Sequence, residues 1–162
     1  MKKMHSLLRA MVAFALCCSM LTGAAMAAET TRVVDTAGGR IVFGAVGSED
    51  RSSVQPRAIT FANESNSKYK FFTGQCQPSQ GDYLDIVVRN QGNAPIMVTL
   101  TVHMGDETIR DARTIQPGAP AYLADVTAPA GKGLDTMFVL EVEPLNTGSN
   151  PYYSVFCQQR WK

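Results

Sequence analysis

Acid–base or nucleophilic catalysis would depend on very few side chains in this sequence of 162 residues. Only one of its two histidines, His103, lies in the body of the chain, so a Ser-His-Asp or Cys-His arrangement would have to use it. His103 alternates with Thr99 and Thr101 in a run of period two, which places it on the polar face of a strand. We therefore interpret His103 as a surface histidine and expect no enzymatic activity.

Metal binding is restricted by the same shortage of ligands. A tetrahedral zinc site takes cysteine and histidine ligands, which are too few in the body of the chain, so we expect no zinc. Calcium remains possible, because two groups of carboxylates lie near turns: Asp82 with Asp85, and Asp106 with Glu107 and Asp111. Neither group has the Asp-x-Asp-x-Asp-Gly spacing of a specific calcium loop, and we favour solvated loop acids as the explanation of both groups. A glycosidase pair also stays open, and it needs two carboxylates roughly 5 to 9 Å apart in a cleft.

Aromatic side chains could supply a sugar-binding surface. Such surfaces stack tyrosine and tryptophan rings on pyranose rings, while polar neighbours bind the hydroxyls. The candidate rings are Tyr83, Tyr122, Tyr152 and Trp161. Because Tyr152 and Tyr153 are adjacent, a strand would point one of them into the core and the other into solvent. A carbohydrate platform would require at least two of the candidate rings to be exposed in one plane, and core packing is the alternative role for each.

The first 27 residues have the pattern of a signal peptide. A cationic start ending at Arg9 is followed by an apolar run, Ala10 to Leu21, and then by Ala25-Met26-Ala27, the small-x-small pattern at which signal peptidase cuts. The apolar run has about 12 residues, whereas a membrane-spanning helix needs about 20. We expect cleavage after Ala27, with Ala28 as the alternative, and export of a mature chain without a transmembrane segment.

Composition and charge limit the class of protein further. The chain is 45% apolar and 8% aromatic, which is ordinary for one globular domain. Removal of residues 1–27 takes away three cations and no acid, so that 15 Lys and Arg become 12, against 14 Asp and Glu. Nucleic-acid-binding proteins usually carry an excess of basic residues, so we expect no nucleic-acid partner.

Two of the four cysteines, Cys76 and Cys157, remain after the expected cleavage. An even pair in an exported protein favours a disulfide. Closing so long a loop in the unfolded chain is worth about 4.5 kcal/mol, less any strain in the folded state. A reactive thiol is the alternative, but neither cysteine lies in a Cys-x-x-Cys context. The sequence therefore predicts a Cys76–Cys157 disulfide.

The elements that would position these side chains are short strands. Runs of period two, each ended by Gly, Pro, Asn or Asp, predict strands at 40–46, 58–62, 69–73, 83–90, 96–104, 108–115, 121–127, 136–143 and 152–158. With no helical periodicity between them, the expected fold is all-β: a two-layer antiparallel β-sandwich of about eight strands, with a β-barrel as the alternative. We divide the chain into a signal peptide (1–27), an N-terminal strand and loose linker (28–56) and the sandwich domain (57–162).

Two local features refine this arrangement. Residues 83–90 and 96–104 flank the turn Gln91-Gly92-Asn93-Ala94-Pro95, and we expect them to form a hairpin. Residues 108–115 carry Arg110, Asp111 and Arg113, and charges of this kind protect an exposed strand from pairing with other chains. We therefore expect 108–115 to be a solvated edge strand.

The segment Ile86 to Leu100, followed by Ile115-Gln116-Pro117-Gly118, has the order strand, Asn-x-Gly-x-x-Pro turn, strand and Pro-Gly. This order resembles immunoglobulin-like and other sandwich modules of bacterial exported proteins. The resemblance implies an exported sandwich, and such modules serve as adhesins, spacers, carbohydrate binders and enzyme appendages. It transfers no functional residue, because turn chemistry informs on fold and not on function.

Together these patterns predict an exported, non-catalytic β-sandwich protein. Its expected role is binding or structural, in the bacterial envelope or the extracellular space, and its expected partner is an extracellular protein or a glycan. The alternative is a carbohydrate-binding module that uses the exposed aromatic residues.

Overall fold

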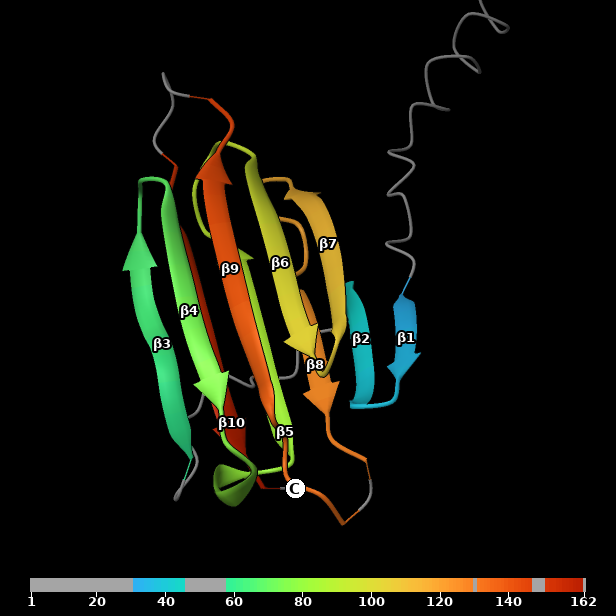
Figure 1. Ribbon diagram of the computed structural model, residues 1–162. Coiled ribbons are helices and arrows are strands. Elements are labelled where there is room, and N and C mark those ends of the chain that lie inside the picture. The colour runs from blue at the N-terminus through green and yellow to red at the C-terminus, as the bar shows by residue number, and fades with distance from the viewer. Residues whose placement is uncertain (1–30, 46–57, 130, 147–150, 162) are drawn as a thin grey trace, which may run out of the picture.

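The computed structural model describes residues 31–45, 58–129, 131–146 and 151–161. These residues form ten strands and one short 3-10 helix (Figure 1): β1 (Arg32–Thr36), β2 (Gly39–Ala45), β3 (Ile59–Asn66), β4 (Lys70–Cys76), η1 (Pro78–Gln80), β5 (Tyr83–Asn90), β6 (Ile96–Met104), β7 (Glu107–Ile115), β8 (Tyr122–Thr127), β9 (Thr136–Pro144) and β10 (Tyr153–Arg160). The expected signal peptide and the loose linker after β2 lie outside the described residues. No helix in the described ranges is long and apolar enough to cross a membrane.

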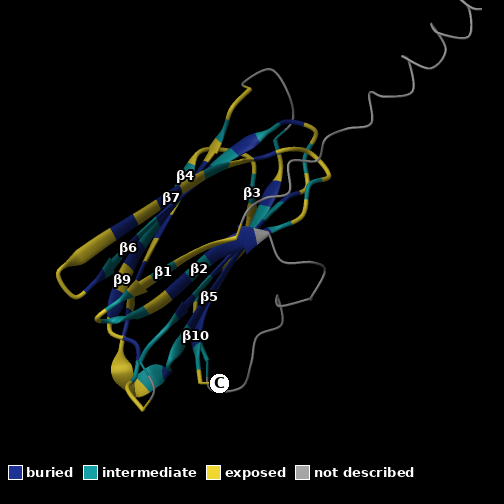
Figure 2. Ribbon diagram, turned by 90° about the vertical axis from the view of Figure 1, so that its right-hand side faces the viewer, coloured by how far each residue is buried: buried dark blue, intermediate teal, exposed yellow. Residues whose placement is uncertain are grey.

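The strands form two antiparallel sheets. Sheet A has six strands in the order β1-β2-β8-β5-β10-β3, and sheet B has four in the order β4-β9-β6-β7. Figure 2 shows the two sheets as separate layers. The predicted all-β sandwich is therefore confirmed, and the alternative of a closed barrel is not what the structure shows.

The pairing of the strands follows one rule. β6 pairs with β7, β5 with β8, β4 with β9, and β3 with β10. The chain is thus one long antiparallel hairpin with its tip at the Gly105–Asp106 turn, rolled so that successive pairs alternate between sheets B and A. This is the connectivity of a jelly roll, an eight-stranded sandwich. β1 and β2 extend sheet A beyond β8, and the strand order differs from the ABED and CFG sheets of an immunoglobulin domain.

The core lies between the two sheets. Alternate residues of each central strand are fully buried, among them Ile86 on β5, Leu100 on β6 and Phe138 on β9. The ring of Phe138 packs edge-on against Phe61 of β3, with 5.3 Å between ring centroids. A Cβ atom on Gly74 would lie 2.3 Å from the Phe138 ring, so this position on β4 has no room for a side chain. The two sheets therefore meet in one close-packed apolar layer.

The predicted hairpin between residues 83–90 and 96–104 is wrong. The two strands have the expected bounds, as β5 and β6, but β5 pairs with β8 and β10 in sheet A, whereas β6 pairs with β7 and β9 in sheet B. Their apolar faces oppose each other across the core and do not share one face of a single sheet. The turn between them is consequently a crossing from one sheet to the other.

The side chain of Asn90 stabilises this crossing. Its side-chain amide is buried and donates hydrogen bonds to the carbonyl oxygens of Ala94 (2.8 Å) and Ile115 (2.9 Å), while its side-chain oxygen accepts one from the backbone N–H of Gly92 (3.1 Å). One side chain thus fixes both the turn and the end of β7 in the opposite sheet. Asn90 opens the Asn-x-Gly-x-x-Pro pattern, so the pattern marks a sheet-to-sheet crossing.

The N-terminal part of the fold is larger than the sequence indicated. The strand expected at 40–46 is β2, which pairs with β8 inside sheet A and buries Ile41 and Phe43 completely, so it belongs to the sandwich itself. β1 was not predicted, because Val33 and Val34 are adjacent and the five residues RVVDT show no alternation of polar and apolar side chains. β3 and β4 extend four and three residues past the expected strands at 58–62 and 69–73. Both are edge strands, whose polar residues blur the alternation.

We predict that Asn90→Ala lowers the free energy of unfolding by about 2–3 kcal/mol, because two buried carbonyl groups lose their donor. Asn93→Ala is the matched control. Asn93 is exposed in the same turn, so its replacement should change stability by less than about 0.5 kcal/mol. Denaturant unfolding followed by tryptophan fluorescence measures both, and equal stability of the two variants would contradict the role given to Asn90.

Candidate binding face

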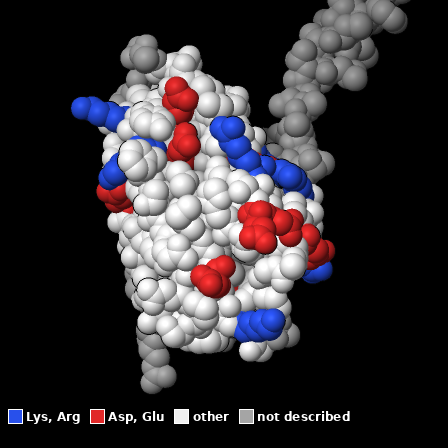
Figure 3. Space-filling model, in the orientation of Figure 1, with Lys and Arg blue, Asp and Glu red and all other residues white. Residues whose placement is uncertain are grey.

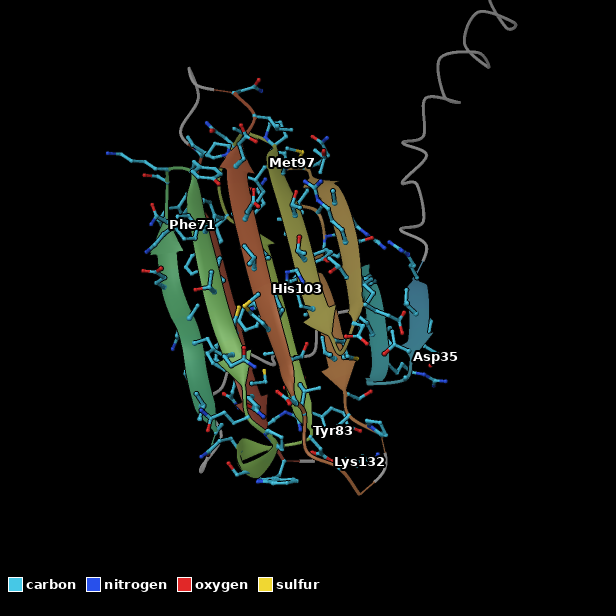
Figure 4. The ribbon with its side chains drawn as sticks, in the orientation of Figure 1. Asp35, Phe71, Tyr83, Met97, His103 and Lys132 are labelled. Carbon is cyan, nitrogen blue, oxygen red and sulfur yellow. The ribbon has the colours of Figure 1, made fainter. Side chains whose placement is uncertain are left out.

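The face of sheet B that points away from the core is the broadest surface with a distinctive composition. We call it the outer face, and it consists of the outward side chains of three neighbouring strands: Phe71, Thr73 and Gln75 of β4, Met137, Val139 and Glu141 of β9, and Met97, Thr99, Thr101 and His103 of β6. The strand register sets these in rows, such as Thr73–Val139–Thr101 and Gln75–Met137–His103. Figure 4 shows Phe71, Met97 and His103 on this face.

Large apolar side chains are exposed on and beside the outer face. Phe71 is 61% exposed, Met137 is 41% exposed, and Tyr69, which precedes β4 by one residue, is 56% exposed. Tyr69 and Phe71 are two residues apart, so in extended backbone they point to the same side of the chain. Apolar groups of this size are usually buried when the chain has an alternative, so their exposure together indicates a contact surface.

One half of the outer face carries no charge. The two rows nearest the C-terminal ends of β4 and β6, Thr73–Val139–Thr101 and Gln75–Met137–His103, contain only Thr, Gln, Val, Met and His. Glu141 lies in the next row, between Phe71 and Thr99, and Glu143 lies beyond it, while Arg110 on β7 and Asp135 just before β9 lie at the margins. Figure 3 shows this uncharged area with the acidic and basic side chains at its margins. Removing the side chains of these two rows from water would therefore involve no desolvation of a carboxylate, an ammonium or a guanidinium group.

His103 lies on the outer face, as expected from its alternation with the threonines. Its Nδ1 is 3.0 Å from the hydroxyl of Thr108 on the neighbouring strand β7. Its carbonyl oxygen accepts a hydrogen bond from the Thr136 hydroxyl on β9. These two contacts fix His103 within the sheet.

The acidic residues considered for calcium have structural partners. Both carboxylate oxygens of Asp85 accept hydrogen bonds from the Arg160 guanidinium, at 2.5 and 3.3 Å, and only 6% of the Asp85 side chain is exposed. Asp106 and Glu107 are exposed at the β6–β7 turn, whereas Asp111 points into the sandwich, so this trio is not brought together. In the ranges that the structure covers, no group of three or more His, Cys, Asp or Glu side chains could hold a metal ion. The calcium hypothesis therefore gains no support from the described residues.

Asp111 instead joins the two sheets at one edge. It accepts hydrogen bonds from Arg113 Nε (3.0 Å) and from the Tyr122 hydroxyl (3.2 Å) of β8, and Arg32 of β1 lies 3.5 Å away. Arg32 also donates to the carbonyl oxygen of Arg110 at 2.9 Å. The expectation that 108–115 is an edge strand is confirmed, but its charges are not all solvated, because Asp111 is buried and Arg113 is mostly so.

Tyr122 is therefore not available as a sugar-stacking ring in this structure. Its side chain is 1% exposed, and burial together with the adjacent Asp111 carboxylate raises the pKa of its hydroxyl, which keeps the phenol protonated as a donor. The alternation along β8 indicates that Tyr122 is buried, because Tyr122 shares a strand face with Ala124 and Val126, which are both fully buried.

The other three candidate rings do not form one surface. Tyr83 and Trp161 lie at the same end of sheet A, where the Arg160 guanidinium sits 5.2 Å from the centre of the Tyr83 ring and Trp161 follows in the chain. Tyr152 lies at the opposite end, next to the residue that pairs with Asn90. As predicted, Tyr152 and Tyr153 point oppositely, with 44% and 0% exposure. The structure brings together two of the four rings at most.

The two cysteines of the predicted disulfide, Cys76 on β4 and Cys157 on β10, are both fully buried and present as thiols. The disulfide thus stays a prediction. The exposed rings on the outer face were missed by the sequence analysis, because Phe71 is followed by Phe72 and the alternation of β4 is hidden. The period-two pair Tyr69 and Phe71 was the signal that could have found them.

No family model, curated protein or solved structure matches this chain.

We predict that Asp111→Ala lowers the free energy of unfolding by about 3 kcal/mol, because it leaves a mostly buried guanidinium and a buried phenol without their shared acceptor. Tyr122→Phe should cost about 1 kcal/mol, since it removes one hydrogen bond. Asp106→Ala, an exposed acid in the adjacent turn, is the control and should be nearly neutral. Thermal and urea unfolding measure all three. Asp111→Ala as stable as Asp106→Ala would rule out a sheet-joining role.

Proposed function

We propose that this chain is an exported, non-catalytic protein of the bacterial envelope or extracellular space, and that it binds another exported protein through the outer face of sheet B. The observation that carries the proposal is the pair of uncharged rows on that face, one of which contains the exposed Met137, with the exposed Phe71 and Tyr69 beside them. The proposed location depends on the N-terminal sequence, with its cationic start, apolar run and Ala25-Met26-Ala27.

The composition of the outer face favours a protein partner. Cores of protein–protein interfaces are enriched in aromatic residues and methionine and depleted of charged residues. The outer face approaches this composition, because Phe71, Met97 and Met137 lie near Thr73, Thr99 and Thr101, and Glu141 is the one Asp, Glu, Lys or Arg residue among the side chains that define the face. A flat sheet face held by a close-packed core also needs little reorganisation before binding, which favours affinity.

The side chains capable of chemistry have structural contacts that support a binding or structural role. Asp85 is paired with Arg160, Asp111 with Arg113 and Tyr122, and His103 with Thr108.

We predict that the mature protein occurs in the envelope or culture fluid of its host with the mass of residues 28–162. Intact-mass spectrometry of the fractionated cells measures this. A protein that keeps residues 1–27 and stays in the cytoplasm would contradict the proposed location.

We predict that a photo-crosslinking residue at position 137 forms adducts in the native host, and that excess purified wild-type protein suppresses them. The matched control carries the same residue at Asn63, which is exposed on sheet A. Replacement of the exposed Met137 should leave the melting temperature within a few degrees of wild type. Identical adducts from both positions, or none from 137, would contradict binding through the outer face.

A carbohydrate ligand is the second candidate, and the pair of exposed rings favours it specifically. Tyr69 and Phe71 lie on one side of the chain, and the register places Glu141 and Thr99 in the row beside Phe71. Lectin domains also use jelly rolls, although a fold does not determine a function. A glycan array that gives binding lost in Phe71→Ala, and retained in Trp161→Ala, would replace the protein partner with a glycan.

A further inference from the structure

The two cysteines occupy facing layers of the core. Cys76 is the last residue of β4, in sheet B, and its register partner on β9 is Thr136. Cys157 lies in the middle of β10, in sheet A, between Ala62 of β3 and Ile86 of β5. Both are 0% exposed and belong to the same apolar cluster between the sheets.

A buried glutamine holds the ends of these two strands together. The Gln159 side chain donates hydrogen bonds to the carbonyl oxygens of Gln77 (2.7 Å) and Gly81 (3.0 Å), and it accepts one from the backbone N–H of Gln77 (3.1 Å). Gln77 follows Cys76 in the chain. The register of β10 against β3 shifts between Cys157 and Gln158, but its register against β5 is continuous and sets Cys157 and Gln159 opposite the core residues Ile86 and Leu84, so both side chains point towards sheet B. We call these three hydrogen bonds the Gln159 clamp, and it holds the Cys76 end of β4 over the inner face of β10.

The electrostatics of the two thiols agree with this placement. Burial raises the pKa of the Cys76 thiol to about 12, with a smaller contribution from Asp135. Burial also raises the pKa of Cys157, and the second cause is Cys76 itself, so the two sulfur atoms are within electrostatic reach of each other. At neutral pH both thiols of the folded protein are protonated, and protonated thiols are poor nucleophiles.

We propose that Cys76 and Cys157 form a disulfide that joins sheet A to sheet B beside the Gln159 clamp, and that it forms before the core has fully closed. The reaction is thiol–disulfide exchange with a low-molecular-weight or protein disulfide. One cysteine thiolate attacks a sulfur of that disulfide and releases one thiolate, giving a mixed disulfide. The second cysteine thiolate then displaces the other half. The protein loses two protons and two electrons, and the oxidant is reduced to two thiols.

The bridge would fix an edge strand. β4 pairs only with β9 within sheet B, and it carries Phe71 on the outer face. A covalent link from Cys76 to a central strand of sheet A would limit fraying of β4 from its free edge. Formation of this bridge uses only the two thiols of the chain and an external disulfide, so it does not depend on the proposed partner.

The test is refolding of the reduced, unfolded protein with oxidised and reduced glutathione, followed by alkylation, intact-mass measurement and peptide mapping. The chain is used as exported or, if export fails, at full length with Cys17→Ser and Cys18→Ser. The expected product is lighter than the reduced chain by two hydrogens, resists alkylation, and yields a peptide pair linking Cys76 to Cys157. Reduction should lower its melting temperature by about 10 °C or more. Cys157→Ser should have the melting temperature of the reduced wild type, and reductant should not change it.

Two glutamine variants test the clamp separately. Gln159→Ala should slow closure of the bridge several-fold and accumulate the mixed disulfide with glutathione. Gln158→Ala is the matched control, because Gln158 is equally buried on the same strand and points to the other face of sheet A. Equal closure rates in the two variants would overturn the role of the clamp. Full alkylation of both cysteines after refolding, or a melting temperature unchanged by reduction, would overturn the bridge itself.

Discussion

One constraint underlies this structure: a single apolar core lies between two sheets, and from β3 onwards the chain changes sheet after almost every strand. Each crossing exposes backbone donors and acceptors near the core, and a buried group without a partner is costly. Side chains provide the partners. Asn90 holds the β5–β6 crossing, Gln159 holds the end of β4, and Tyr153, whose pKa burial raises to about 12, donates its hydroxyl to the Lys68 carbonyl at the β3–β4 crossing. The jelly roll depends on these few polar contacts.

The outward faces of the two sheets differ in composition and in exposure to solvent. On sheet A, the residues that point away from the core include Val87, Leu123 and Phe156, a second apolar cluster with at most 4% exposure. Beside it, Asp85 is paired with Arg160. On sheet B the corresponding positions are Thr, Met, Val and Phe, and several of them are open to solvent. The asymmetry explains why the outer face of sheet B, and not the acids and aromatic rings that the sequence first suggested, is the better candidate for recognition.

The sequence predicted those parts of the fold in which local pattern and tertiary environment agree. β5, β6 and β9 each have alternate apolar residues that point into the core, so period-two alternation located them to within a residue. Alternation does not indicate which of two sheets a strand joins. The expected β5–β6 hairpin was therefore wrong, because a five-residue turn can connect two paired strands or two strands in different sheets equally well. The candidate rings failed for a related reason. Tyr122 was judged by residue type, although its position on β8 already placed it with the core residues Ala124 and Val126.

The long folded hairpin has a kinetic consequence. Its tip, β6–β7, joins residues separated by a two-residue turn, whereas β3 and β10 pair residues as distant as Ile59 and Gln159. For residues so far apart in sequence, the entropy cost of loop closure comes before any stabilising contact forms. All-β proteins of this kind therefore fold in milliseconds to seconds, slowly compared with helical bundles. The tip can form early, while β10 can take its place between β5 and β3 only after most of the chain is ordered. The last element to dock is therefore a central strand of sheet A, and the facing edges of β5 and β3 stay unpaired until it arrives.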